Sequence, residues 1–128
     1  GINIYKEIIE KIPKVIQIDA GRLSVANFDA AALVKDGSKF IHRGIEQRDA
    51  AIKAGAKGAT TLMYEKDRFT LPMESIDCAK DFPSNIWVIL EKKFKPSDGD
   101  VIIISSSDIE ESAIYGALAG ALTLVEAP

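Results

Sequence analysis

The chain has 128 residues, of which 47% are hydrophobic and 27% are charged, and its formal net charge is -3 at pH 7. This composition is globular and predicts one domain, residues 1–128, around a single hydrophobic core. Because acidic and basic residues are scattered, we expect no basic surface for nucleic acid or for an anionic membrane.

The chain has a single cysteine, Cys78, which cannot form a disulfide within the chain and favours a reducing compartment. The first residues do not combine a basic region, a long apolar run and a small-residue cleavage site. The longest weakly polar run, residues 113–125, is shorter than the roughly 20 residues that a membrane span requires. We therefore expect a cytoplasmic protein without membrane partners.

The start of the chain predicts one helix and one strand. Isoleucines at helical spacing, opposite lysines and glutamates, predict an amphipathic helix over residues 3–12, which Pro13 ends. The β-branched run after the proline predicts a strand over residues 14–19.

Residues 24–43 allow two interpretations. Residues 24–35 have the pattern of a capped helix, whereas residues 31–43 have that of a hairpin turning at Asp36 and Gly37. An Asp-Gly pair between alternating segments is the strongest short hairpin signal. The hairpin is therefore the preferred prediction, and the helix is its alternative.

The middle of the chain predicts a helix followed by a second hairpin. A helical pattern covers residues 45–54, and a short glycine-containing turn leads to an apolar strand over residues 59–64. Residues 65–67 form a polar turn to a further strand, residues 68–71.

Two apolar runs in the second half, residues 86–90 and 101–104, predict interior strands, because a strand buried on both faces is continuously apolar. Residues 73–83 are expected to be irregular, and residues 95–99 to be a loop. Together the elements predict an α/β fold, with α+β as its alternative. A central mixed sheet is flanked by helices, and a long C-terminal helix packs on it.

That C-terminal helix is predicted over residues 108–124, where Ser107 and Glu110 have the spacing of a capping box. Gly116 and Gly120 make one side of the helix small. Glycine is unfavourable inside a helix, so the pair predicts a close approach, either to the chain's own sheet or to the same helix of a second copy. We favour a homo-oligomer, and a dimer first.

The first candidate site consists of Ser105, Ser106 and Ser107 with Asp108, between a predicted buried strand and a helix start. Open α/β sheets bind ligands at such places, and hydroxyls with free N–H groups can hold a phosphate. Simple helix capping is the alternative, because carboxylates in the first helical turn repel an anion.

The second candidate is Asp19, at the end of the first predicted strand, with Arg22 and Asp29 in the polar segment that follows. Strand-end carboxylates beside a loop are suited to acid–base chemistry. The alternative is that both aspartates only shape turns, which Asp often does.

The third candidate is His42, the only histidine, next to Arg43. An imidazole beside a guanidinium can act as a general base with an anion clamp, although a solvent-exposed histidine is the simpler interpretation. No metal-ligand spacing or nucleotide-binding motif occurs, so no metal site is predicted and the cofactor is unknown.

Two functions fit these observations. The first is a small-ligand-binding or catalytic domain for a nucleotide-like or phosphorylated ligand, with Asp19 and His42 as catalytic residues. The second is a non-catalytic homo-oligomeric subunit that assembles through its C-terminal helix. Convergence of Asp19, His42 and Ser106 in one pocket would favour the first.

Overall fold

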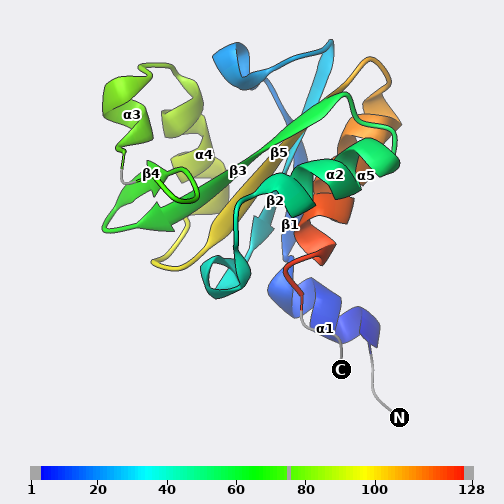
Figure 1. The fold of residues 1–128 in the computed structure, drawn as a ribbon, viewed down its shortest axis with the longest axis horizontal. Coiled ribbons are helices and arrows are strands. Elements are labelled where there is room, and N and C mark those ends of the chain that lie inside the picture. Colours follow the sequence, from blue (N-terminus) through cyan, green and yellow to red (C-terminus); the bar gives the residue numbers. More distant parts are fainter. Residues whose placement is uncertain (1–3, 75, 126–128) are drawn as a thin grey trace.

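A computed structural model describes residues 4–74 and 76–125, without the side chains of Ile4, Tyr5 and Arg22. It contains a five-stranded sheet in the order β1-β2-β5-β3-β4 (Figure 1). The strands are β1 (Lys14–Ile18), β2 (Phe28–Val34), β3 (Gly58–Glu65), β4 (Arg68–Thr70) and β5 (Val101–Ser107). The α-helices are α1 (Ile4–Lys11), α2 (Ile45–Lys53), α3 (Cys78–Asp81), α4 (Ile86–Phe94) and α5 (Glu110–Leu122).

Two antiparallel pairs, β1–β2 and β3–β4, are joined by the central strand β5, which pairs antiparallel with β2 and with β3. The α/β class and the packing of the C-terminal helix on the sheet are confirmed. Every ladder between the described strands is antiparallel, so the fold is the α+β form of that class, and the sheet is not mixed.

Side chains alternate along the strands and form one hydrophobic cluster on each face of the sheet. On one face, Leu33 and Ile102 pack with Trp87 and Leu90 of α4. On the other face, Ala32 and Ile103 pack with residues of α5. Figure 1 shows α3 and α4 on one side of the sheet, and α2 and α5 on the other.

The close approach predicted for the glycines of α5 is made to the chain's own domain. A Cβ at Gly116 would lie 2.3 Å from Oγ of Ser105, and a Cβ at Gly120 would lie 2.9 Å from Cγ2 of Ile103. The small side of α5 is therefore covered by the sheet and α2. This close packing also explains the buried alanines Ala30 and Ala32 of β2, which face α5, where larger side chains would separate helix and sheet.

The prediction of a strand at residues 86–90 is wrong, because these residues begin α4. Ile86, Trp87, Leu90 and Phe94 are buried, while Val88 is exposed. This spacing lines one side of a helix, and it becomes visible only when the apolar run is followed to Phe94.

For residues 24–43 the helix interpretation is wrong, and the preferred hairpin is correct only in its first strand and its turn. Residues 28–34 form the strand β2, and Gly37–Phe40 form a 3-10 helix in place of the second hairpin strand. The turn itself is present, because Asp36 has a left-handed backbone with φ of 53°. The predicted capping box is absent, because α5 begins after Ile109 without a side-chain cap.

The other predicted elements are confirmed: the first helix from residue 4 onward, the strands near residues 14–19, 59–64 and 101–104, the hairpin to residues 68–71, and the helices near 45–54 and 108–124. Residue 3 lies outside the described residues. Residues 73–83, expected to be irregular, contain the short helix α3. Within the described ranges, no helix has the length and apolar character needed to cross a membrane.

Candidate functional site

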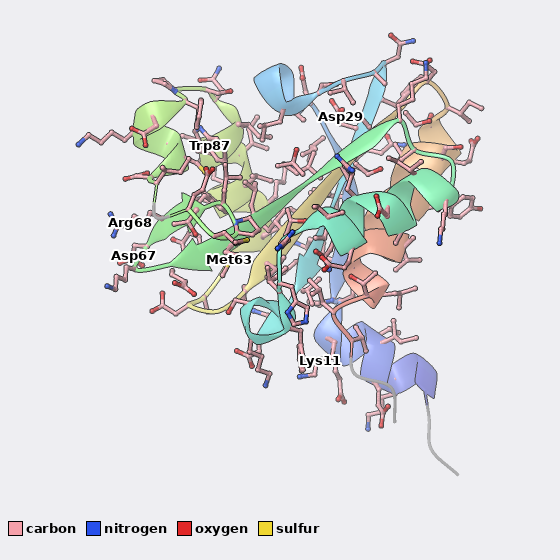
Figure 2. The ribbon with its side chains drawn as sticks, in the orientation of Figure 1. Lys11, Asp29, Met63, Asp67, Arg68 and Trp87 are labelled. Atoms are coloured by element: carbon pink, nitrogen blue, oxygen red, sulfur yellow. The ribbon has the colours of Figure 1, made fainter. Side chains whose placement is uncertain are left out.

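Asp29 is the centre of a buried hydrogen-bond cluster at one end of the sheet (Figure 2). Its Oδ1 accepts hydrogen bonds from the hydroxyls of Ser24 and Ser106, both at 2.7 Å. Its Oδ2 accepts one from the N–H of Ala20 at 3.0 Å. Because donors of the chain itself occupy both carboxylate oxygens, Asp29 links the β1–β2 connection to β5.

Asp19 is exposed immediately after β1. Its Oδ1 accepts a hydrogen bond from the N–H of Gly21 at 3.0 Å, which is the turn-forming role considered for it. It also lines a hollow of about 340 Å³ with Ser24 and Asn27. The side chain of Arg22 lies outside the described residues.

The three serines are not in a loop, because β5 continues to Ser107 and all three are buried. Ser105 packs against Gly116, and its Oγ has no hydrogen-bond partner within the described part of the chain. The Oγ of Ser107 donates to the carbonyl of Gly55 at 3.2 Å and accepts from the N–H of Ile109 at 3.3 Å. The predicted exposed hydroxyl loop is therefore wrong.

Asp108 follows β5 and is exposed, and it forms an ion pair with Lys57. The hydrogen bond from the Lys57 ammonium lowers the pKa of the Asp108 carboxyl below its usual value. The carboxylate is therefore already paired with a cation of the chain.

His42 is exposed, and its side chain has no hydrogen-bond or ion-pair partner in the described ranges. It precedes α2, whereas Asp19 follows β1 and lines a different hollow. Asp19, His42 and Ser106 are thus not brought into one pocket. Arg43 is the predicted site residue that lines a second cleft.

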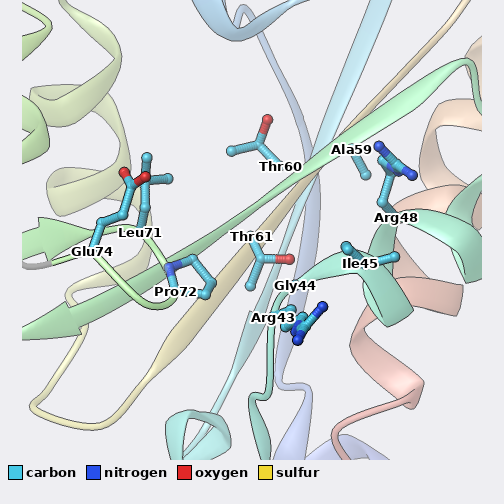
Figure 3. A pocket seen from close by; sticks show the side chains of 10 residues that line it. All are labelled: Arg43, Gly44, Ile45, Arg48, Ala59, Thr60, Thr61, Leu71, Pro72 and Glu74. Atoms are coloured by element: carbon cyan, nitrogen blue, oxygen red, sulfur yellow. The ribbon is translucent and has the colours of Figure 1, made fainter.

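This second cleft, about 280 Å³ in volume, lies between the start of α2 and the turn after β4 (Figure 3). Residues of β3 form its floor, residues around the start of α2 form one wall, and residues after β4 form the other. The lining residues are Arg43, Gly44, Ile45, Arg48, Ala59, Thr60, Thr61, Leu71, Pro72 and Glu74.

Thr61 is the polar residue of the floor that most clearly lacks a partner. Only 6% of its surface is exposed, and its hydroxyl makes no hydrogen bond to any described residue. Figure 3 shows the Thr61 oxygen on the side of Gly44. The fully buried side-chain atoms without a partner in the described residues are Gln47 Oε1 and Ser105 Oγ, so the Thr61 hydroxyl is open to the cleft, with an unused donor and acceptor there.

The start of α2 supplies further donors to the same cleft. Gly44 precedes the helix with φ of 85°, and no side chain caps the first helical turn. A Cβ at Gly44 would lie 3.3 Å from Cγ of Pro72 and 3.5 Å from Cβ of Thr61, so glycine keeps the cleft narrow here. The free N–H groups of a first helical turn attract anions.

The two walls of the cleft carry different charges. Arg43 and Arg48 line the side of α2, and Glu74 lines the opposite side (Figure 3). The Arg48 guanidinium lies 3.6 Å from the exposed Asp49 carboxylate, while Arg43 has no ion-pair partner in the described ranges. Glu46 is also in the first turn of α2, but two residues before Arg48, and therefore on nearly the opposite side of the helix.

Sequence reasoning found Arg43 but missed Arg48 and Thr61. The sequence contains one signal for this cleft: Gly44 stands immediately before the predicted helix, so no side chain caps its first turn. Nothing in the sequence alone places the threonines of a distant strand beneath that helix. Within the described ranges, no three His, Cys, Asp or Glu side chains are grouped so that they could hold a metal ion.

A family model described as "Domain of unknown function (DUF4443)" matches residues 25–124. The solved structure of "Hypothetical protein PH0730 from Pyrococcus horikoshii OT3" has a TM-score of 0.72 to this chain and 24% sequence identity. The match covers 94% of this chain and 60% of that protein, so the chain spans less than two thirds of its length. This likeness shows a common fold alone. No curated protein matches the chain significantly.

Proposed function

We propose that this chain, which belongs to the family described as "Domain of unknown function (DUF4443)", binds a small anionic ligand in the cleft at the start of α2. The ligand is of the phosphorylated or nucleotide-like class. The observation that carries this proposal is the hydroxyl of Thr61, which makes no hydrogen bond to any described residue and lies in a cleft that Arg43 and Arg48 also line.

Three kinds of donor face the same volume: two guanidinium groups, one hydroxyl and the first N–H groups of α2. Guanidinium groups bind phosphate oxygens with two parallel hydrogen bonds, and a helix start adds a favourable dipole. The Glu74 carboxylate on the opposite wall repels a second negatively charged group of a ligand. A monoanionic or zwitterionic ligand therefore fits the cleft better than a polyphosphate.

The proposal is for binding rather than for catalysis, because the predicted acid–base residues Asp19 and His42 do not line this cleft. The alternative, an oligomeric subunit assembled through the C-terminal helix, has less support, because the small side of α5 is covered by its own sheet. A cytoplasmic location belongs to the same proposal, supported by the single buried cysteine, Cys78.

The test is a thermal-shift and calorimetric panel of inorganic phosphate, sugar phosphates, nucleoside monophosphates and carboxylates. A ligand at about 100 times its dissociation constant adds roughly 2.7 kcal/mol of stability and raises the melting temperature by several degrees. Arg43→Gln or Arg48→Gln should weaken binding by about 10- to 100-fold, as expected when a charge-assisted hydrogen bond is lost. Thr61→Val, which keeps the shape but removes the hydroxyl, should weaken it by about tenfold.

Lys92→Gln is the charge-matched control, because Lys92 is exposed on α4, which packs on the other face of the sheet from α2 and α5, and does not line the cleft. Its effect on affinity should be small. A flat panel, or a ligand whose affinity is unchanged in the Arg43→Gln/Arg48→Gln double variant, would show that the proposal is wrong.

A further inference from the structure

The sheet ends in two edge strands, which differ in how well they are protected against pairing with a strand of another chain. At one end, β4 has only three residues, begins with Arg68 and is soon followed by Pro72. Short length, charge and proline are the devices by which proteins prevent pairing at a sheet edge. The edge at β4 is therefore protected.

At the other end, β1 is longer, and it has a proline and a charge only at its start, Pro13 and Lys14. It pairs with β2 in continuous register from Lys14 to Ile18, without a bulge, and no described strand pairs with its outer side. Between its ends it contains no charge and no proline, and Val15, Ile16 and Ile18 are only partly buried. Its one charged side chain, Lys14, donates a 2.8 Å hydrogen bond to the carbonyl of Lys93. An edge of this kind is a template for another strand.

We propose that β1 pairs with β1 of a second copy of this chain, antiparallel about a two-fold axis at Ile16, so that two five-stranded sheets become one. The proposal is independent of the ligand cleft. A two-fold axis makes the contact self-complementary, as in most homodimers.

The sequence of β1 favours its own copy as the partner. In this register Ile16 lies opposite Ile16, Val15 opposite Gln17, and Lys14 opposite Ile18 of the second copy, so no like charges meet. The exposed Asp19 follows Ile18 and lies near Lys14 of the second copy. A parallel arrangement would instead place Lys14 beside Lys14, which is unfavourable.

Disulfide trapping tests the register in a Cys78→Ala background. The two-fold axis places position 16 of one copy directly opposite position 16 of the other, within the reach of a disulfide. Mild oxidation of Ile16→Cys should give a covalent dimer of twice the 13.9 kDa chain mass. Lys14→Cys is the control, because its two copies would be about 13 Å apart and should remain unlinked.

Sedimentation of the unsubstituted chain up to about 100 µM gives the dissociation constant, since a dimer of micromolar affinity is fully formed there. Ile16→Lys, which sets like charges opposite each other, should dissociate the dimer. Ile16→Ala, which loses comparable packing without adding charge, should keep it. A chain that stays monomeric at the highest concentration, or equal cross-linking at positions 14 and 16, would overturn the proposal.

Discussion

Ser106 donates a buried 2.7 Å hydrogen bond to Asp29, across 77 positions of sequence, and so fastens β5 to β2 at the end of the sheet. Asp29 accepts two further hydrogen bonds, from Ser24 and Ala20, in the connection between β1 and β2. One carboxylate therefore holds three segments together. Its role in the described structure is to stabilise the sheet end.

Asp29→Ala should lower the free energy of unfolding by about 3 kcal/mol, because two buried donors and one partly buried donor lose their acceptor. Urea denaturation measures the change. Asp19→Ala is the matched control, since Asp19 is exposed and accepts only the Gly21 N–H, and it should cost less than about 1 kcal/mol. Equal effects of the two substitutions would contradict the structural role of Asp29.

Gly116→Ala should destabilise the fold by about 1–3 kcal/mol, because the new Cβ would lie 2.3 Å from Oγ of Ser105 and 2.8 Å from Cβ of Ala56. Ser105→Ala alone should be neutral or stabilising, since the removed hydroxyl has no partner within the described ranges. The double variant should recover part of the loss. Additive effects in this double-mutant cycle would show that the two side chains do not collide.

Stability should fall in alkaline solution. Burial raises the pKa of the Cys78 thiol from 9.0 to about 11, with the carboxylates of Asp77, Asp81 and Glu74 adding to the effect. Burial and the hydrogen bond to Glu91 raise the pKa of Tyr64 from 10.0 to about 12.

The folded chain holds these two protons more tightly than the unfolded chain. Their contribution is complete below pH 9, and it is lost as the pH rises through 9–11 for Cys78 and 10–12 for Tyr64. Urea midpoints measured across this range should fall less steeply in Cys78→Ala and, above pH 10, in Tyr64→Phe. Parallel curves for all three proteins would contradict these assignments.

Lys57→Gln should raise the pKa of Asp108 towards its usual value, because the Lys57 ammonium is the main cause of its depression. Carboxyl carbon NMR titration measures this pKa directly. Lys53→Gln, which removes a cation from the last turn of α2, is the control and should leave the Asp108 titration unchanged. High salt should reduce the difference, since the pair is exposed.

The sequence predicted most elements correctly where the hydrophobic residues of a segment had one clear periodicity, or where the residues of a turn were recognisable. The helix before Pro13 and the hairpin around residues 65–67 are examples. The hairpin interpretation predicted only residues 31–34 of β2, because the first half of the strand contains Asp29 and Ala30, and aspartate and alanine are poor strand formers. Two alanines of β2, Ala30 and Ala32, face the closely packed helix α5, a tertiary contact that local propensity does not contain.

The candidate site was predicted only in part, for a similar reason. Arg43 was identified from its neighbourhood in sequence, whereas Thr61 belongs to a strand that α2 covers. The three serines resembled a loop because their hydroxyls are polar. Their pairing with β2 and β3 and their contacts with Asp29, Gly55 and Gly116 are made by residues far away in the chain.

The central position of β5 has a consequence for synthesis of the chain on the ribosome. The β1–β2 and β3–β4 hairpins have no ladder with each other, and both pair with seven residues near the end of the chain, Val101–Ser107. Each hairpin leaves the ribosome before its central partner, with an apolar edge still open. The sheet is completed only when β5 inserts between the two hairpins. A nascent chain that has not yet reached residue 101 therefore exposes two aggregation-prone strand edges at the same time.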